Sequence, residues 1–191
     1  MTGCKTPGSP VYLSHSNKEG RRLAYTWEMI EVDGTWVGIN TLLPNGLVAE
    51  AVEAGMIREL QGCTTLRREV CTRQGTRLDL CLKSSHGSCF VEVKNVTLAI
   101  DGTAAFPDAV SKRGVEHLKE LTRLRRKGHR AAVVFVIQRN DCSAFRPADE
   151  IDKEYGRCLR RAISAGVEAL PYWARVTPGE IVLAESLPIK L

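Results

Sequence analysis

The sequence contains no long apolar run, and none of its stretches approaches the roughly 20 apolar residues needed to span a bilayer. Its start, MTGCKTPGSP, also lacks the charged and then apolar order of a secretory signal peptide. Hydrophobic residues nevertheless make up 43% of the 191 residues, which is enough for a packed core. We therefore expect a globular protein of the cytoplasm that has no membrane partner.

The sequence also lacks the cysteine spacing of zinc-binding and redox motifs, because no two of the seven cysteines are separated as C-x-x-C. The number of cysteines is odd, and most of them fall within or beside apolar segments. Cysteines in such positions are typically free thiols that pack as small hydrophobes. The sequence thus predicts free cysteines and no structural zinc site.

Positive charge is concentrated in residues 112–130, although the net charge of the whole chain is only +5. This segment holds eight lysines and arginines against two acids, and its last part, RLRRKGHR, has no acid. Such a cluster favours an anionic partner, most simply nucleic acid. It is equally typical of a solvated helix end whose cations complement the helix dipole. The candidate DNA contacts in it are Arg123, Arg125, Arg126 and Lys127.

The hydrophobic pattern predicts a β-rich start followed by an α/β region. Residues 1–36 show short strands and turns, which are too few to form a core alone. After residue 40 the order is helix, three strands, helix, strand, helix, strand, which predicts a mixed sheet with an antiparallel meander. Between these elements we expect a loop over DGTAAFPDAV and then a helix that Ser111 caps and Gly128 ends.

Charged residues interrupt two of the predicted strands. Glu92 and Lys94 lie two apart in CFVEVKNVTL, so alternation puts both on one face. Asp79, in TRLDLCL, faces away from the three leucines of that stretch. If the two strands pair as a hairpin, Asp79 and Glu92 converge, as a cation such as Mg²⁺ requires. Glu50, on the preceding helix, would add an oxygen, and Lys94 would hold a phosphate or orient a water.

The same residues have a simpler interpretation as a solvated strand face. Glu-x-Lys on a strand is commonly a weak surface ion pair, and Asp79 is more commonly an exposed strand residue than a ligand. Against this, Phe90 and Val96 share the face of Glu92 and Lys94, so the face is not uniformly polar. The order of the polar candidates on helix, strand and strand favours metal-assisted phosphodiester hydrolysis.

The predicted helix carries two further candidates. Arg113 and His117 are four residues apart and share one face, where they can line a cleft and contact phosphate. A core or surface position suits His117 equally well. Asp108, just before the helix, is better explained by hydrogen bonds to backbone N–H groups.

Several long stretches closely resemble the bacterial and archaeal sugar fermentation stimulation protein A family: INTLLPNGLVAEAV, TRLDLCL, CFVEVKNVTL, AFPDAVSKRGVEHLKEL and RPADEID. The resemblance runs from the first residues to the last. It implies the α/β fold class with a PD-(D/E)xK nuclease-like core, a restriction-endonuclease-like domain over residues 37–191. It also implies that residues 1–36 are the remnant of an N-terminal OB-fold domain, a class that commonly binds nucleic acid.

The resemblance also implies roles for the polar candidates. Asp79, Glu92 and Lys94 match the acid, acid and lysine positions of that core, and Glu50 matches its helix glutamate. We therefore expect Mg²⁺ or Mn²⁺ at Asp79 and Glu92, with Lys94 and Glu50 in catalytic positions. The family is described as DNA-binding, which leaves two functions open, a metal-dependent nuclease and a non-catalytic DNA-binding regulator of sugar metabolism. An interaction module without nucleic acid is a third.

The sequence departs from the family at two places. MTGCKTPGSPVYL resembles the middle of the OB domain, so the first strands of that barrel are expected to be missing. Exposed strand edges would then make residues 1–36 prone to aggregation. The second departure is Lys112, which stands where relatives are expected to have an acid.

Overall fold

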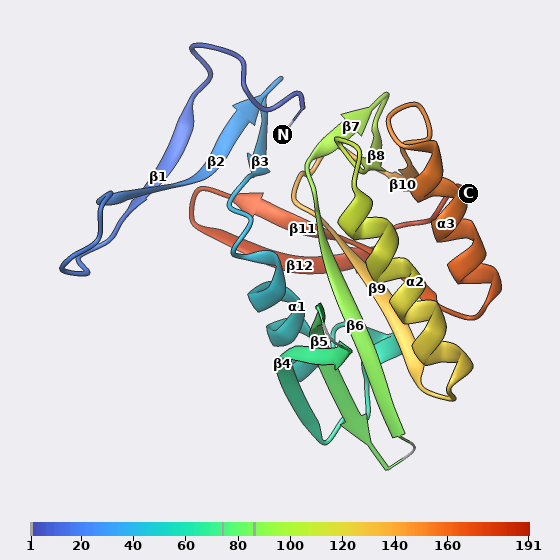
Figure 1. The fold of residues 1–191 in the computed structure, drawn as a ribbon. Helices are drawn as coiled ribbons and strands as arrows, with labels where there is room; N and C mark the ends of the chain where they lie inside the picture. The colour runs from blue at the N-terminus through green and yellow to red at the C-terminus, as the bar shows by residue number, and fades with distance from the viewer. Residues whose placement is uncertain (1, 74, 86) are drawn as a thin grey trace.

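The computed structural model describes residues 2–73, 75–85 and 87–191, and its centre is a six-stranded mixed sheet (Figure 1). The strand order is β12-β11-β9-β6-β5-β4. The strands β6, β9 and β11 run parallel to one another, whereas β4, β5 and β12 pair antiparallel with their neighbours. The bounds are Thr65–Arg73 (β4), Thr76–Ser84 (β5), Gly87–Val96 (β6), Arg130–Ile137 (β9), Glu168–Thr177 (β11) and Glu180–Ser186 (β12).

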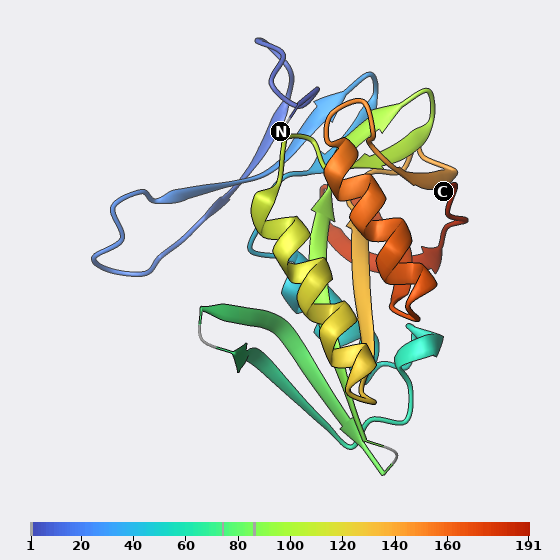
Figure 2. The ribbon, with the colours of Figure 1, turned by 45° about the vertical axis from the view of Figure 1, so that its right-hand side comes forward.

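Helices cover both faces of this sheet (Figure 2). The helix α1 (Pro44–Glu53) lies on one face, followed by a short 3₁₀ helix, η1 (Arg58–Leu60), while α2 (Lys112–Arg126) and α3 (Lys153–Ser164) lie side by side on the other. Each face has its own core, because alternate side chains of β6 and β9 point to opposite helix layers. The stretch AAVVFVI of β9 is accordingly buried at every position.

Two small three-stranded sheets flank the central sheet. The strands β1, β2 and β3 form an antiparallel sheet at the start of the chain, and β10, β8 and β7 form another beside the helices α2 and α3. Their bounds are Val11–His15, Tyr25–Val32, Thr35–Gly38, Ala144–Pro147, Thr103–Phe106 and Leu98–Ile100, in that order. The α/β class and the antiparallel meander from β4 to β6 are confirmed.

The expected loop over residues 101–110 is wrong in its first half. Asp101 and Gly102 both have positive φ, 48° and 67°, and form the turn between β7 and β8. Asp-Gly is a preferred turn for two-residue hairpins, because both positions require left-handed backbone. The single strand expected over CFVEVKNVTL is likewise divided, since β6 ends at Val96 and β7 begins at Leu98.

The helix α2 begins as predicted. The Ser111 hydroxyl accepts the Gly114 N–H at 3.1 Å, which confirms the cap. Gly114 also permits close packing on α3, because a Cβ there would lie 2.9 Å from the Tyr155 ring. The helix ends at Arg126, two residues before Gly128 with its positive φ of 89°.

None of the helices in the part of the chain that the structure describes is long and apolar enough to cross a membrane. All seven cysteines are free thiols, which confirms that prediction.

Candidate functional site

The site begins where two paired strands separate. The pairing of β5 with β6 runs from Ser84–Gly87 to Leu80–Val91 and goes no further. Beyond it, the carboxylate of Asp79 takes the place of a ladder partner, and its Oδ2 accepts the Val93 N–H at 2.8 Å. The other oxygen, Oδ1, accepts a hydrogen bond of 2.9 Å from the side-chain amide of Asn45, at the start of α1. Asp79 is therefore fixed between α1 and the open edge of β6.

Glu92 lies at the same end of β6, on the face covered by α2. Its residue is only 3% exposed, and its Oε1 accepts a hydrogen bond of 2.6 Å from the Lys94 ammonium group. The same oxygen contacts Nδ1 of His117. The second oxygen, Oε2, is buried and has no hydrogen-bond partner among the described residues. One half of a buried carboxylate thus carries all the stabilising contacts, and the other half is left unsatisfied.

His117 is held on its far side by Arg113, whose Nε donates to His117 Nε2 at 3.4 Å. A guanidinium group has only donors, so Nε2 must accept and the ring proton lies on Nδ1. The Nδ1–H group then donates to Glu92 Oε1. The chain of hydrogen bonds from Arg113 through His117 to Glu92 therefore fixes both the tautomer of the histidine and the orientation of the carboxylate.

The two carboxylates differ in their electrostatics. Burial, together with the negative charge of Glu92, raises the pKa of Asp79, although the Val93 N–H and Asn45 oppose the shift. Burial also acts to raise the pKa of Glu92, but hydrogen bonds from His117 and Lys94 and the lysine charge outweigh it. The pKa of Glu92 is therefore lowered. The pair consists of one stabilised anion and one carboxylate that a further cation would stabilise.

A groove of about 720 Å³ leads to this site between α2 and the hairpin of β4 and β5. Its walls include Arg77 from β5 and Arg113 and His117 from α2. Cys71, Gly75, Thr76 and Glu116 complete the lining. We call it the site groove, because His117 connects it to Glu92.

The structure brings five of the predicted residues together: Asp79, Glu92, Lys94, Arg113 and His117. Glu50 is exposed and its side chain makes no hydrogen bond or ion pair within the described residues, so its assisting role stays a prediction. Asn45 takes the helix contact to Asp79 instead. It was not predicted, although a polar residue directly after Pro44 in an otherwise apolar helix start is a recognisable signal.

One predicted orientation is wrong. The three leucines of TRLDLCL do not share a face, because Leu78 packs with the α2 and α3 core whereas Leu80 and Leu82 pack with the α1 core. The physical reason is the separation of β5 from β6 at Asp79, which lets the strand turn between Leu78 and Leu80.

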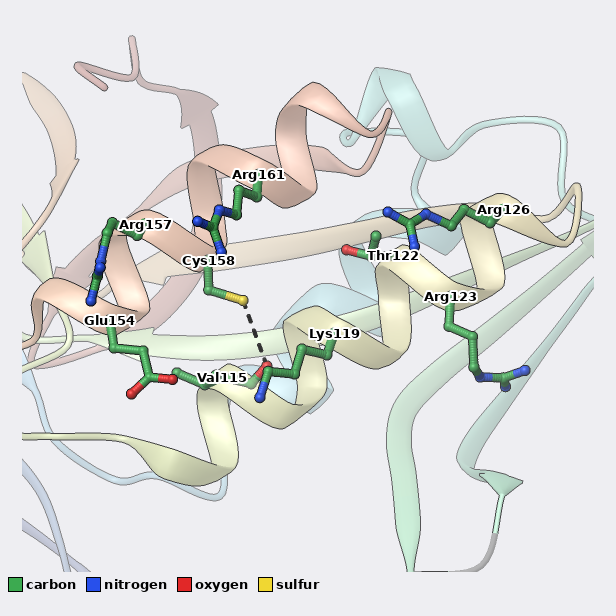
Figure 3. A pocket seen from close by; sticks show the side chains of 9 residues that line it. All are labelled: Val115, Lys119, Thr122, Arg123, Arg126, Glu154, Arg157, Cys158 and Arg161. Carbon is green, nitrogen blue, oxygen red and sulfur yellow. Dashed lines mark hydrogen bonds between the residues drawn. The ribbon is translucent and has the colours of Figure 1, made fainter.

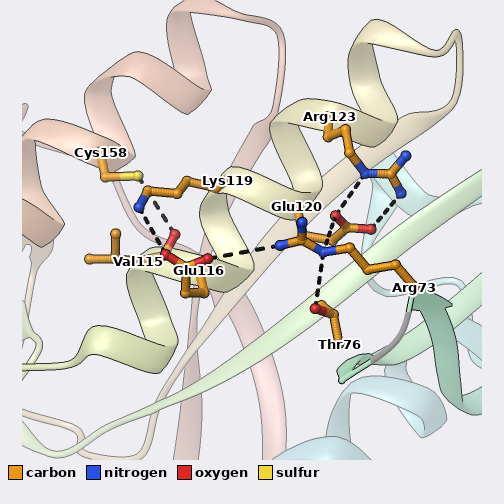
Figure 4. A network of polar contacts seen from close by, with 8 residues as sticks. All are labelled: Arg73, Thr76, Val115, Glu116, Lys119, Glu120, Arg123 and Cys158. Atoms are coloured by element: carbon orange, nitrogen blue, oxygen red, sulfur yellow. Dashed lines mark hydrogen bonds and ion pairs between the residues drawn. The ribbon is translucent and has the colours of Figure 1, made fainter.

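The predicted DNA contacts on α2 have different surroundings. Arg123 binds the buried carboxylate of Glu120 through two hydrogen bonds of 2.6 and 2.8 Å (Figure 4). Arg125 donates to the Gly166 carbonyl at 3.1 Å. Arg126 and Lys127 are exposed and have no side-chain partner in the described part of the chain. Glu120, which sequence reasoning missed, is marked only by its place three residues before Arg123.

Within residues 2–73, 75–85 and 87–191 no group of three or more His, Cys, Asp or Glu side chains is arranged to hold a metal ion. The side-chain ligands that the site offers are therefore the two carboxylates of Asp79 and Glu92. Any further ligand has to come from the backbone or from water.

Fold and site together define a class: a mixed α/β domain with a small β sheet before it, and a buried glutamate and a half-buried aspartate beside a lysine. Two family models match the chain. The one described as "Sugar fermentation stimulation protein RE domain" covers residues 42–180, and "SfsA N-terminal OB domain" covers residues 1–39. The chain belongs to the sugar fermentation stimulation protein family, SfsA.

Curated relatives and a solved structure agree with this assignment. The sugar fermentation stimulation protein homolog of Geobacter sulfurreducens is 56% identical over 99% of this chain and 81% of its own length. The homolog of Geotalea daltonii is 52% identical over 100% of this chain and 83% of its own length. The structure of Pyrococcus furiosus SfsA in complex with Ca²⁺ has a TM-score of 0.89 and 32% identity, over 97% of this chain and 80% of that one.

Proposed function

We propose that this protein binds DNA and hydrolyses phosphodiester bonds at a divalent cation, Mg²⁺ or Mn²⁺, held by Asp79 and Glu92 in a nuclease-like core. The observation that carries the proposal is the buried, unpartnered Oε2 of Glu92. An unsatisfied carboxylate oxygen in a protein interior is costly unless a ligand completes it. The pKa of Asp79 is raised by burial and by the negative charge of Glu92, which supports a cation between the two carboxylates.

The donor set fits a hard cation. Carboxylate and carbonyl oxygens are the ligands that Mg²⁺ and Ca²⁺ prefer, and Mg²⁺ usually keeps several waters beside one or two carboxylates. The Val93 carbonyl would add a third oxygen, because the N–H and C=O of one strand residue project to the same edge and its N–H meets Asp79. The related Pyrococcus furiosus protein has been solved in complex with Ca²⁺, which supports a divalent cation in this family.

When bound, the cation would supply a Lewis acid and a more acidic water. The remaining work falls to this chain's own residues. His117 and Arg113 hold Glu92 in one orientation. Lys94, 2.6 Å from Glu92, is placed to meet the negative charge of a phosphate that enters from the site groove. Among the proposed site residues, the assignment of Glu50 has the least structural support, because this residue is exposed on α1.

DNA binding is proposed to rest on the exposed cations of α2 and of the site groove. Arg77 and Arg113 line that groove, and Arg126 and Lys127 lie at the far end of the helix. Contacts of this kind neutralise phosphates and release counterions, so they weaken steeply as salt rises. Seven free thiols fit the proposed location in the cytoplasm, where cysteines stay reduced.

The test is digestion of duplex and single-stranded DNA with Mg²⁺ or Mn²⁺, compared with EDTA. We expect cleavage by the wild type and its loss in Asp79→Ala. Glu53→Ala is the matched control, because Glu53 is an exposed acid on α1 outside the site. If Asp79→Ala and the wild type show the same background cleavage, this protein is not a nuclease.

A second function is a DNA-binding regulator that does not cut. The exposure of Glu50 favours it, because the site then offers a cation only two carboxylates. DNA retardation that depends on salt, together with the same background digestion in wild type and Asp79→Ala, would identify this function.

A further inference from the structure

A second groove lies between α2 and α3, on the opposite flank of α2 from the site groove (Figure 3). Its volume is about 550 Å³. At about 100° per residue, Val115, Thr122 and Arg126 point roughly half a turn away from Arg113 and His117, whereas Arg123 lies nearer the side of the site groove. We call it the helix groove; its lining comprises Val115, Lys119, Thr122, Arg123, Arg126, Glu154, Arg157, Cys158 and Arg161.

The charges of the helix groove are strongly unbalanced. Five of its nine lining residues are cations, and Glu154 is the only acid among them. Lys119 and Arg123 are paired with Glu116 and Glu120 of their own helix. Arg126 and Arg161 have no side-chain hydrogen bond or ion pair within the described residues.

Arg157 is nearly as free, because its guanidinium group makes only a long contact of 3.4 Å with the Lys153 carbonyl. Three arginines in one groove thus lack a carboxylate partner. Like charges that face each other without counter-charges repel, so an anion between the helices would be bound favourably.

The two helices hold this groove open at a fixed width. Gly114 lets α2 approach the Tyr155 ring at one end. The Cys158 thiol lies 3.8 Å from the Val115 carbonyl in the middle, and Arg125 binds the Gly166 carbonyl at 3.1 Å near the other end. The cations are therefore displayed on a packed scaffold, which lowers the ordering cost of binding.

We propose that the helix groove binds the phosphate backbone of one nucleic-acid strand outside the site groove. The cations are spread along the helices rather than gathered at one point. Lys119 and Arg126 are seven residues apart, about 10 Å along α2, and Arg157 and Arg161 are about 6 Å apart along α3. A strand of duplex carries one charge about every 3.4 Å of its axis, so the groove spans about three phosphates.

The floor of the helix groove and its position beside α2 also suit a nucleic-acid strand. Val115, Thr122 and Cys158 give a floor with little charge, against which sugars can pack. Because α2 separates the two grooves, a nucleic acid at the proposed site can cross this helix and continue between α2 and α3. The inference shares its nucleic-acid partner with the proposed function, but it needs neither the cation nor cleavage.

The test is fluorescence anisotropy of a labelled DNA duplex and a labelled single strand, in EDTA, across a salt series. The variant is Arg126→Gln with Arg161→Gln, whose side chains make no hydrogen bond or ion pair within the described residues. The matched control is Arg68→Gln with Lys83→Gln, two exposed cations of β4 and β5 outside both grooves. Thermal melting confirms that both variants fold like the wild type.

We expect the groove variant to bind at least about tenfold more weakly at low salt and the control to bind like the wild type. Losing two phosphate contacts should reduce the slope of log affinity against log salt by about 1.8 for duplex or about 1.4 for single strand. An unchanged slope in the groove variant overturns this inference and removes Arg126 from the proposed DNA contacts, but it leaves the cation site and the contacts of the site groove standing. A wild type that binds DNA in EDTA but does not cut it with Mg²⁺ or Mn²⁺ contradicts the nuclease, and the salt slope of the groove variant still decides this inference.

A mononucleotide distinguishes a small phosphate ligand from a strand. If a free mononucleotide displaces the labelled strand as well as an unlabelled strand does, the groove is a small-ligand site and the inference of a backbone site is wrong. If wild type binds no DNA at low salt, both this inference and the proposed function fail.

Discussion

Glu120 of α2 and Glu92 of β6 are both buried, but their carboxylate oxygens are hydrogen-bonded to very different degrees. Glu120 is 1% exposed and Glu92 is 3% exposed. Both oxygens of Glu120 bind Arg123, and Oε2 also lies 3.2 Å from Arg73 of β4 (Figure 4). Glu92 has Lys94 and His117 on one oxygen and, in the part of the chain that the structure describes, no partner on the other.

This difference suggests different roles for the two carboxylates: Glu120 stabilises the fold, whereas Glu92 has an oxygen available to a ligand. The hydrogen bonds from Arg123 lower the pKa of Glu120 even though burial opposes this. Its network joins α2 to the strand β4 and so holds one wall of the site groove in place. Burial alone therefore does not identify a functional acid; the count of satisfied oxygens does.

The largest expected effect is on cation-dependent stability. A cation bound only by the folded state should stabilise it by about 2.7 kcal/mol at a hundred times its Kd. For a chain of this size, that corresponds to a rise of about 5–10 °C in Tm. Thermal melting with Ca²⁺ or Mg²⁺ against EDTA should show this rise in the wild type.

The same rise should vanish in Asp79→Ala and Glu92→Ala, and persist in Glu120→Gln and Glu50→Ala. Since each variant is compared with itself in EDTA, its basal stability does not affect the result. A rise that survives in Glu92→Ala would place the cation elsewhere.

The next effect concerns the fold. Glu120→Ala leaves Arg73 and Arg123 without their shared carboxylate, and we expect a loss of about 1–3 kcal/mol in unfolding free energy. This is below the usual 3–5 kcal/mol for breaking a buried pair, because both arginines are partly exposed. Urea denaturation measures it, and Glu116→Ala, which removes a solvent-exposed acid, is the control. Equal stability of the two variants would contradict the structural role of Glu120.

A smaller effect is expected from His117→Gln. The glutamine removes the ring that orients Glu92, and loss of such a supporting contact typically weakens metal binding about 10–100-fold. Titration with Mn²⁺ measures the affinity. Unchanged Mn²⁺ affinity together with reduced DNA affinity would instead support His117 as a direct phosphate contact.

The smallest expected effect is the change of cation affinity with pH near neutrality. The pKa of Asp79 is raised and that of Glu92 is lowered, so Asp79 is the first of the two to bind a proton as the pH falls. Cation affinity should be nearly constant at neutral pH and fall below the raised pKa of Asp79, by at most about tenfold per pH unit for one proton. Asn in place of Asp79 should remove this step.

Sequence reasoning succeeded where one element determined the outcome. The shared face of Glu92, Lys94, Phe90 and Val96 follows from strand alternation, and the structure confirms it. The Ser111 cap follows from the local sequence in the same way.

It failed where two elements had to be placed together. The role of Asn45 depends on where the start of α1 lies against β5, and the unsatisfied oxygen of Glu92 depends on how α2 lies across β6. The arginines of α3 entered no prediction, because only the packing of α3 beside α2 brings Arg157 and Arg161 to the groove of Arg126. The Asp101–Gly102 turn, in contrast, was readable from the sequence.

The separation of β5 from β6 at Asp79 also has a consequence for the order of folding. Asp79 and the Val93 N–H are 14 positions apart and meet within one hairpin, whereas His117 reaches Glu92 from 25 positions away on a helix. Contacts between near neighbours in sequence cost less chain entropy and form faster. We therefore expect Asp79 and Glu92 to come together when the hairpin forms. Their carboxylates should reach their final orientation only later, when α2 docks and His117 contacts Glu92.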